Sequence, residues 1–211
     1  MLNICEKCGI YRADKTIDPS GPFAICPACG HRHDFLYTPL WIVSGASGSG
    51  KSTVCSHLTG KFQQLVFLDS DILWRESFNT PETNYSDFFE TWLRMCKNIA
   101  QSGRPVALFG AGAGVPENLK NCIERRYFSA IHYLALVCSD DVLTKRLLAR
   151  PQWRGTQTTA FIDEQKRFNQ WFMNYNSRGL RPAIRLLDTT LLSVEETAQE
   201  ISNWIHENLI P

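Results

Sequence analysis

The stretch that most constrains the fold of this chain is Gly45-Ala46-Ser47-Gly48-Ser49-Gly50-Lys51-Ser52, which directly follows an apolar run at 40–44. It matches the pattern Gly-x4-Gly-Lys-Ser between a predicted strand and a predicted helix over 51–58, the context in which this pattern has physical meaning. Its glycines allow successive backbone amides to face a phosphate, and the helix N-terminus adds a favourable dipole. The alternative is a glycine-rich turn that matches by chance. The flanking elements favour a phosphate-binding loop.

A nucleotide is the expected ligand of this loop, which we take to run from Gly45 to Thr53. Lys51 is predicted to reach the β- and γ-phosphates and to act in catalysis, and the Ser52 hydroxyl to bind Mg²⁺. The sequence contains no Asn-Lys-x-Asp motif of the kind that reads guanine. We therefore expect ATP, together with Mg²⁺.

Two carboxylates, Asp69 and Asp71, follow the next predicted strand at 65–68. Ligands of open α/β sheets gather at the carboxyl ends of the strands, so both side chains should lie near the phosphate loop. We expect Asp69 to hold Mg²⁺, through water, and Asp71 to be the base that accepts a proton from an attacking hydroxyl. The alternative is that Asp71 only caps a helix that begins at Ile72.

Three arginines, Arg146, Arg150 and Arg154, follow the predicted strand at 131–137. Arg146 and Arg150 are four residues apart and share one helix face. Pro151 ends that helix, which leaves Arg154 on a loop that can close over the phosphates. Guanidinium groups can stack on adenine or stabilise a transferring phosphoryl group. We expect Arg146 and Arg150 to bind the nucleotide, and Arg150 and Arg154 to act in catalysis; a solvated basic helix end is the alternative.

Strand-like and helix-like patterns alternate along the chain from about residue 38 to residue 211. Such alternation predicts an α/β fold in which helices cover both faces of a parallel sheet. Ser193 and Glu196 form a predicted capping box at the start of the last helix. The predicted strands cover 40–44, 65–68, 105–109, 131–137 and 184–187, and the predicted helices cover 51–58, 85–101, 140–149, 161–176 and 193–209.

The first 36 residues contain two close pairs of cysteines, each pair followed by a glycine: Cys5, Cys8, Cys26 and Cys29. This spacing predicts a zinc ribbon, because each Cys-x-x-Cys-Gly turn points two thiolates at one ion and four thiolates complete a tetrahedral site. The segment 11–24 between the pairs predicts a short hairpin. Metal binding would supply much of the folding energy of a segment with few large apolar residues. A redox-active Cys-x-x-Cys is the alternative.

The remaining composition indicates a globular protein of the cytoplasm. The net charge of +1 gives no global basic field, so we do not expect nucleic acid as a partner. No apolar segment is long enough to span a bilayer and no secretion signal is evident, so we expect no membrane contact. His31 and His33 could replace a zinc ligand, but we expect both to be exposed. Four further cysteines are predicted to be reduced core residues: Cys55, Cys96, Cys122 and Cys138.

Taken in order, four features resemble the shikimate-kinase and nucleoside- and nucleotide-kinase branch of P-loop proteins. They are the phosphate loop, Asp69-Ser70-Asp71, the turn Phe109-Gly110-Ala111-Gly112-Ala113-Gly114 and the arginine segment. Three further stretches are similar, more narrowly, to bacterial nucleoside or broad-specificity nucleotide kinases: Arg126–Cys138, Arg150–Arg154 and Phe168–Trp171.

The resemblance covers about residues 38–211 and implies a three-layer α/β/α P-loop kinase fold with a five-stranded parallel sheet in the order 2-3-1-4-5. It implies that the segment at about 72–95 folds over the acceptor and that a lid covers about 150–165. It also implies that two glycines lie beside the acceptor or the γ-phosphate, Gly110 and Gly112, and two further residues beside adenine, Asp188 and Thr189.

The sequence departs from this branch in two places. The third strand ends in glycine, where many P-loop proteins have an aspartate, which leaves the Mg²⁺ role to Asp69, as in shikimate kinases. The zinc ribbon at 1–36 is outside the resemblance, which begins with the predicted kinase domain at 38–211.

The acceptor site is the least constrained part of the prediction. The segment 72–95 is rich in aromatic side chains, and Trp74 and Phe88 could wall off a flat or apolar ligand, with Arg75 as an anion contact. The alternative is that Phe88 and its neighbours at i+4 and i+7 form the buried stripe of one helix.

Three functions are compatible with these features. The first is an ATP-dependent kinase that phosphorylates a hydroxyl of a small molecule, a nucleoside or related metabolite, with Asp71 as base. The second is a nucleoside monophosphate kinase, in which arginines would grip the acceptor phosphate. The third is an ATP-dependent nucleic-acid-binding or RNA-modifying module that uses the zinc ribbon, although acidic residues offset the cations of that ribbon. Asp71 favours the first function, and the ribbon could equally serve dimerisation or protein contact.

Overall fold

The computed structural model describes residues 2–209, which form two separate β-sheets. The first sheet is antiparallel and has the order β1 (Thr16–Asp18), β2 (Phe23–Ile25), β3 (Arg32–Asp34). The second has five parallel strands: β4 (Leu40–Gly45), β5 (Val66–Asp69), β6 (Val106–Phe109), β7 (Ile131–Val137) and β8 (Arg185–Asp188). Its order, β5-β6-β4-β7-β8, is 2-3-1-4-5 when counted from β4. The predicted fold class and strand order are confirmed.

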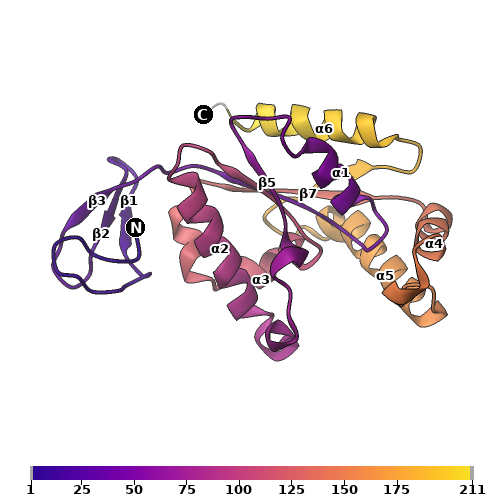
Figure 1. The fold of residues 1–211 in the computed structure, drawn as a ribbon, viewed down its shortest axis with the longest axis horizontal. Helices are drawn as coiled ribbons and strands as arrows, with labels where there is room; N and C mark the ends of the chain where they lie inside the picture. Colours follow the sequence, from indigo (N-terminus) through magenta and orange to yellow (C-terminus); the bar gives the residue numbers. More distant parts are fainter. Residues whose placement is uncertain (1, 210–211) are drawn as a thin grey trace.

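Helices cover both faces of the parallel sheet (Figure 1). One face carries α1 (Lys51–Leu58) and α6 (Val194–Glu207), which pack against each other. The opposite face carries α2 (Ser86–Ala100), α3 (Pro116–Lys120) and α5 (Thr159–Tyr175). The remaining helix, α4 (Asp140–Leu148), packs against α5 beside the phosphate loop. This three-layer arrangement leaves the carboxyl ends of the strands open at one edge of the sheet.

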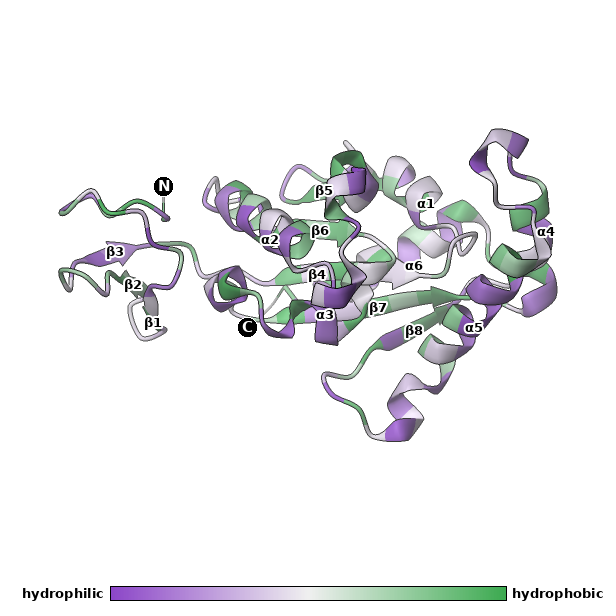
Figure 2. Ribbon diagram, turned by 90° about the horizontal axis from the view of Figure 1, so that it is seen from below, coloured by the Kyte–Doolittle hydropathy of each residue, from purple (hydrophilic) through white to green (hydrophobic). Residues whose placement is uncertain are grey.

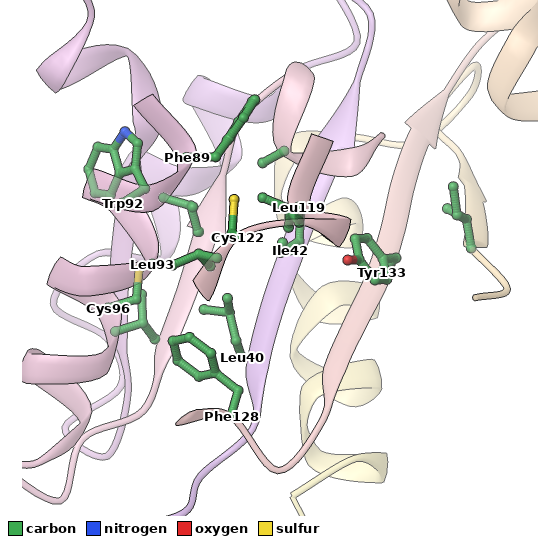
Figure 3. Packing of buried hydrophobic residues seen from close by; sticks show 14 of the residues in the cluster. Leu40, Ile42, Phe89, Trp92, Leu93, Cys96, Leu119, Cys122, Phe128 and Tyr133 are labelled. Atoms are coloured by element: carbon green, nitrogen blue, oxygen red, sulfur yellow. The ribbon is translucent and has the colours of Figure 1, made fainter. Parts of the chain in front are cut away.

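The central strand β4 is buried along its whole length, as expected for a parallel strand covered on both faces. Leu40 and Ile42 belong to the apolar cluster under α2, which also contains Trp92 and Leu93 of that helix (Figure 3). Trp41, between them, faces the other cluster, under α1 and α6. In Figure 2 the strands β4 and β7 are mostly hydrophobic, whereas the helices carry both colours. This difference is expected, because the helices pack one face on the sheet and expose the other to solvent.

Local capping explains several boundaries. The last helix has the predicted box, in which Ser193 Oγ accepts from Glu196 N and Glu196 accepts from Ser193 N. Helix α5 begins two residues before the predicted start because Thr158 caps it, accepting from Phe161 N. A helix beginning at Ile72, which the alternative role of Asp71 requires, is absent from the described residues. A 3₁₀ turn, Ser70–Leu73, takes its place.

This 3₁₀ turn decides which aspartate is the cap. Asp69 Oδ1 accepts a hydrogen bond of 3.0 Å from Asp71 N. The alternative in which Asp71 serves only as a helix cap is therefore wrong, because Asp69 has that role and the Asp71 carboxylate is free of it.

Residues 2–36, which we call the N-terminal head, contain the small sheet and pack at one end of the molecule beside α2 (Figure 1). Leu2, Ala24 and Phe35 form a small apolar cluster with Tyr127, whose hydroxyl donates to Ala13 O at 2.7 Å. The predicted short hairpin within 11–24 is present as β1 and β2, which extend one residue beyond that range, and β3 adds a third strand that was not predicted.

Candidate active site

The phosphate loop joins β4 to α1, as predicted, and its backbone needs glycine. Gly45 has φ +140°, and a Cβ there would lie 2.4 Å from the carbonyl oxygen of Leu136. Gly50, at φ +105°, precedes the first residue of α1 in the left-handed region. The hydroxyl oxygen of Ser49 is buried without a hydrogen-bond partner in the described residues. These features are those of a loop that turns its polar groups toward a ligand.

Lys51 is turned onto its own loop. Its Nζ donates to the carbonyl oxygens of Gly45, at 2.8 Å, and Ala46, at 2.9 Å. Burial lowers the pKa of Lys51 to about 8, against the opposing attraction of Asp71. Both carbonyl contacts compensate the burial of the ammonium group.

A cavity of about 370 Å³ opens on one side of the loop. It brings together residues from four segments that are far apart in the sequence. The predicted site residues that line it are Ser47, Gly48, Gly50, Lys51, Ser52, Thr53, Asp69, Asp71, Gly110, Arg150 and Arg154. Ser56 and Ala111 also line it and were missed in the sequence, where both are unremarkable small residues. The lining is mostly polar and carries charges of both signs.

The two carboxylates in this cavity differ in their partners. Asp69 accepts the amide of Asp71. Burial, followed by repulsion from Asp69, raises the pKa of Asp71, while Lys51, Arg154 and Arg150 oppose this shift. A carboxylate with a raised pKa is the better proton acceptor, because basicity rises with pKa.

The lid arginines lie across this cavity from the carboxylates. Burial and the neighbouring Arg154 lower the pKa of Arg150, and Asp71 opposes that change. Arg154 lies 5.3 Å from the ring centre of Trp153 on a short 3₁₀ turn, Gln152–Arg154. Within residues 2–209 neither guanidinium group is in a salt bridge, so both leave positive charge in the cavity that the phosphate loop also lines.

Arg146 has a different position from the other two arginines. It donates to Thr189 Oγ1 at 3.1 Å and to Thr189 O at 2.9 Å, and Thr189 is itself buried. With Arg150 and Thr189 it lines a second cavity of about 330 Å³, which is also lined by residues of α1 and of the start of α6 and shares Gly48 and Gly50 with the first. Leu192 and Val194 provide apolar wall there, and the sequence analysis missed both.

Asp188 is not among the residues that line either cavity. Its carboxylate accepts from Thr190 N at 2.8 Å and from Thr190 Oγ1 at 2.5 Å, which closes a turn. Among the described residues, Asp188 therefore shapes the chain between β8 and α6, whereas Thr189 faces the cavity.

The glycine turn after β6 is required by packing. A Cβ on Gly110 would lie 2.2 Å from Ser70 Oγ, so this glycine lets the ends of β5 and β6 approach each other. A Cβ on Gly112 would lie 3.0 Å from Phe89. Gly110 lines the larger cavity, whereas Gly112 lies against α2 outside its lining.

The predicted acceptor segment lies beside the larger cavity without lining it, within residues 2–209. Phe88 is buried and packs against Trp74, with ring centres 5.2 Å apart. Arg75 lies over the ring of Phe78, at 4.6 Å. The buried stripe on α2 that was weighed as an alternative for Phe88 and Trp92 is present in the structure.

The four head cysteines converge. Their sulfur atoms all lie within 4.8 Å of one another, with Cys5 and Cys29 separated by 3.6 Å and Cys8 and Cys26 by 3.9 Å. A tetrahedral Zn²⁺ with Zn–S bonds of ~2.3 Å needs sulfur separations of roughly 3.8 Å, so the cluster fits a small zinc site. Burial opposes ionisation of Cys5, but the N–H groups of Cys8 and Lys7 lower its pKa to about 5.

The expectation that His33 is exposed is wrong. Its side chain is only 4% accessible, because β3 places it on the inner face of the small sheet, and its Nδ1 lies 3.8 Å from a carboxylate oxygen of Glu6. His31 is half-buried. The other four cysteines are buried and unpaired, as predicted: Cys55, Cys96, Cys122 and Cys138.

One contact to the phosphate loop was missed entirely. Gln165, on α5, accepts a hydrogen bond of 2.8 Å from Ser47 N. The available signal was a polar pair, Gln165 and Asn169, within the otherwise apolar face of a predicted amphipathic helix.

Comparison with solved structures shows where this fold occurs. The chain is similar to a sugar kinase from Janibacter sp. (15% identity, 82% of this chain and 96% of that chain, TM-score 0.54). It is also similar to a gluconokinase from Sinorhizobium meliloti 1021 (17% identity, 82% of this chain and 94% of that chain, TM-score 0.53). A third similar structure is shikimate kinase from Bacteroides thetaiotaomicron (18% identity, 80% of this chain and 98% of that chain, TM-score 0.51). At these identities the similarity establishes the P-loop kinase-type fold alone.

None of the curated proteins matches the chain. Within residues 2–209, no helix combines the length and apolar character needed to cross a bilayer. A family model described as an AAA domain matches residues 40–174, which run from the start of β4 through most of α5 and include the phosphate loop, Asp69, Asp71 and the lid arginines. Because this match spans more than half of the 211 residues, the chain belongs to the AAA domain family of P-loop proteins.

Proposed function

We propose that this protein is an ATP-dependent kinase that transfers the γ-phosphoryl group to a hydroxyl of a small molecule, a nucleoside or related metabolite. The observation that carries the proposal is one cavity in which the phosphate loop, Asp71 and both lid arginines meet. Donor, base and charge stabilisation are the parts that phosphoryl transfer requires.

We assign the base of the nucleotide to the smaller cavity and its phosphates to the loop and the larger cavity. The cavity with Leu192, Val194 and Thr189 would take the base, because it combines apolar wall with polar groups. The loop amides, Lys51 and Arg146 would hold the phosphates. Ser52 and Asp69 would hold Mg²⁺, which neutralises phosphate charge when bound.

In the transfer step, the acceptor hydroxyl gives its proton to the Asp71 carboxylate as its oxygen attacks the γ-phosphorus. The bond from the γ-phosphorus to the bridging oxygen breaks, and ADP leaves with that electron pair. Lys51, Arg150 and Arg154 stabilise the negative charge on the transferring group.

A nucleoside monophosphate kinase is supported less well by the cations around the cavity. An acceptor phosphate needs arginines that are free to bind it, yet Arg75 lies on Phe78 and Arg94 is bound to Glu124. Within residues 2–209, Arg150 and Arg154 are the arginines in the lining of the larger cavity. A hydroxyl acceptor facing Asp71 is therefore favoured.

A nucleic-acid function of the head is also less well supported. Arg12 pairs with Asp14, Arg32 pairs with Asp18, and Lys15 is fully buried against Leu2 O. Paired and buried cations cannot provide the phosphate contacts that such binding needs. We propose that the head, with zinc bound by its four cysteines, is a structural module or a protein-contact module.

A screen of coupled ADP release tests the function. The purified full chain is given ATP and Mg²⁺ with panels of nucleosides, nucleoside monophosphates, sugars and sugar acids. We expect turnover with a hydroxyl acceptor. Turnover confined to monophosphates would replace this proposal by the second function, and absence of turnover together with absence of nucleotide binding would refute a kinase.

A further inference from the structure

The phosphate loop is held by a side chain from outside it. Ser47 N donates to Oε1 of Gln165, 118 residues further along the chain, at 2.8 Å. Amides of such loops are the donors that bind phosphate oxygens. The Gln165 oxygen therefore sits on one of the loop's donors, in the way that an anionic oxygen would.

The helix that carries Gln165 is fixed firmly. Asn169, four residues later and so on the same face, donates to Cys138 O at 2.7 Å and accepts from Cys138 N at 3.3 Å. Ile162, three residues earlier, packs with Ala46 of the phosphate loop in one apolar cluster. Gln165 lies between these two anchors, so its reach to Ser47 is set by the core.

The side-chain carboxamide of Gln165 also has a nitrogen, Nε2. Within residues 2–209, its Nε2 has no hydrogen-bond partner, while its Oε1 is held by Ser47. A carboxamide has two donor hydrogens on that nitrogen. Gln165 is half-buried and lies outside the lining of both cavities, but its carboxamide is in contact with Ser47, which lines the larger cavity.

The location of Ser47 indicates which part of a nucleotide it faces. Ser47 lines the larger cavity, with Asp71 and Arg154, and is not among the residues that line the smaller cavity assigned to the base. A nucleotide with its base in the smaller cavity would point its terminal phosphate toward Ser47.

We propose that Gln165 is a specificity-determining residue that holds the phosphate loop and contacts the terminal phosphoryl group. Its carbonyl oxygen keeps Ser47 in place, and its NH₂ group donates to a phosphoryl oxygen that ATP has and ADP lacks. This inference rests on the proposed nucleotide function and adds a selectivity for ATP. It also links the predicted lid at 150–165 to the loop, because α5 begins within that segment and carries Gln165 on its second turn.

The test is equilibrium binding of a non-hydrolysable ATP analogue and of ADP to the full chain, with Mg²⁺. Gln165→Glu keeps the length and the acceptor oxygen but replaces the donor with a negative oxygen. We expect a loss of roughly tenfold or more in affinity for the ATP analogue and a much smaller loss for ADP. Gln165→Leu, which removes both the NH₂ donor and the oxygen that holds Ser47 without adding charge, should reduce the preference for the ATP analogue by a smaller factor.

Gln199→Glu, the same chemical change at an exposed site on α6, is the control and should change neither affinity. Thermal melting of each variant identifies a folding defect. Equal weakening of both nucleotides, or unchanged affinities in both Gln165 variants, overturns the inference. Wild-type protein that binds neither nucleotide refutes the proposed function instead, so the two failures are distinguishable. If Gln165→Glu does not fold, Gln165→Leu alone carries the test.

Discussion

The N-terminal head and the P-loop core are stabilised by different means. The core has two large apolar clusters, one on each face of a fully buried central strand. The head has one small cluster, to which the core contributes Tyr127, and four converging sulfur atoms. Burial of apolar surface stabilises the core. The head is too small for a comparable apolar core and instead has the donor set of a metal site. The comparison shows how a short segment without a core of its own can remain ordered.

The boundary between the two regions is polar and buried. Glu124 accepts from Asn3 of the head at 2.9 Å and from Arg94 at 2.9 Å, and it pairs with Lys97, whose side chain is completely buried. Lys97 also donates to Asn3 Oδ1 at 2.6 Å. We propose a domain boundary near residues 36–38, with this network fixing the orientation of the head on α2.

The largest expected effect concerns chemistry confined to the core. Lys51→Ala should abolish phosphoryl transfer, because it removes the cation assigned to the β- and γ-phosphates. Folding should be retained, since a buried ammonium is removed together with its two carbonyl contacts. Turnover is measured by ADP release and the fold by circular dichroism. Surviving activity in the folded variant would contradict the assignment of the loop.

Asp71→Asn should lower phosphoryl transfer by about 10² to 10⁴, the range for loss of a general base, while nucleotide binding is retained. Single-turnover kinetics and ADP affinity separate the two effects. Near-normal turnover would exclude Asp71 as the base.

The raised pKa of Asp71 also predicts how the stability of the Asp71→Asn variant depends on pH. An acid whose pKa is raised on folding contributes stability below its unfolded pKa and loses that contribution as the pH rises through the folded value. Asp71→Asn should therefore raise the melting temperature at pH 7, and this gain should disappear at acidic pH. In the wild-type enzyme, activity should fall as the pH drops through the raised pKa.

The network at the boundary predicts a stability effect without loss of the active site. Glu124→Gln leaves Lys97 buried without its counter-ion, which should lower the free energy of unfolding by about 3–5 kcal/mol. Glu117→Gln is the matched control, because its pair with Lys120 is exposed and should be worth about 1 kcal/mol or less. Denaturant unfolding measures both. Equal effects at the two sites would mean that the buried network does not hold the regions together.

Removal of metal should have the smallest effect on the core. A chelator should abolish hydrogen-exchange protection in β1, β2 and β3, because the sulfur cluster would lose its ion. Protection in β4, β6 and β7 should remain, because two apolar clusters hold those strands. Loss of protection that spreads into β4 would show that the head is needed to fold the core.

Much of the fold and part of the site could be predicted because their signals are local. A strand, a Gly-x4-Gly-Lys-Ser loop and a helix occupy 19 consecutive residues, Leu40–Leu58, and each fixes the conformation of the next. The aspartates after β5 and the arginines after β7 meet the loop because all of these strands are parallel and end at the same edge. The acceptor segment could not be resolved in this way, because aromatic residues at helical spacing are compatible with either a ligand wall or a core.

The sequence by itself determined the phosphate loop, the meeting of Asp71 with Arg150 and Arg154 at one edge of the sheet, and the cysteine pairs, and its resemblance to P-loop kinases implied the strand order. The tertiary structure alone decided that Phe88 is core, that His33 is buried, that Asp69 is the cap, and that Gln165 reaches Ser47. The physical reason is sequence separation. Spacing constrains neighbours within a turn or along one sheet edge, whereas contacts such as Ser47–Gln165 and Asn3–Glu124, 118 and 121 residues apart, depend on how whole layers pack.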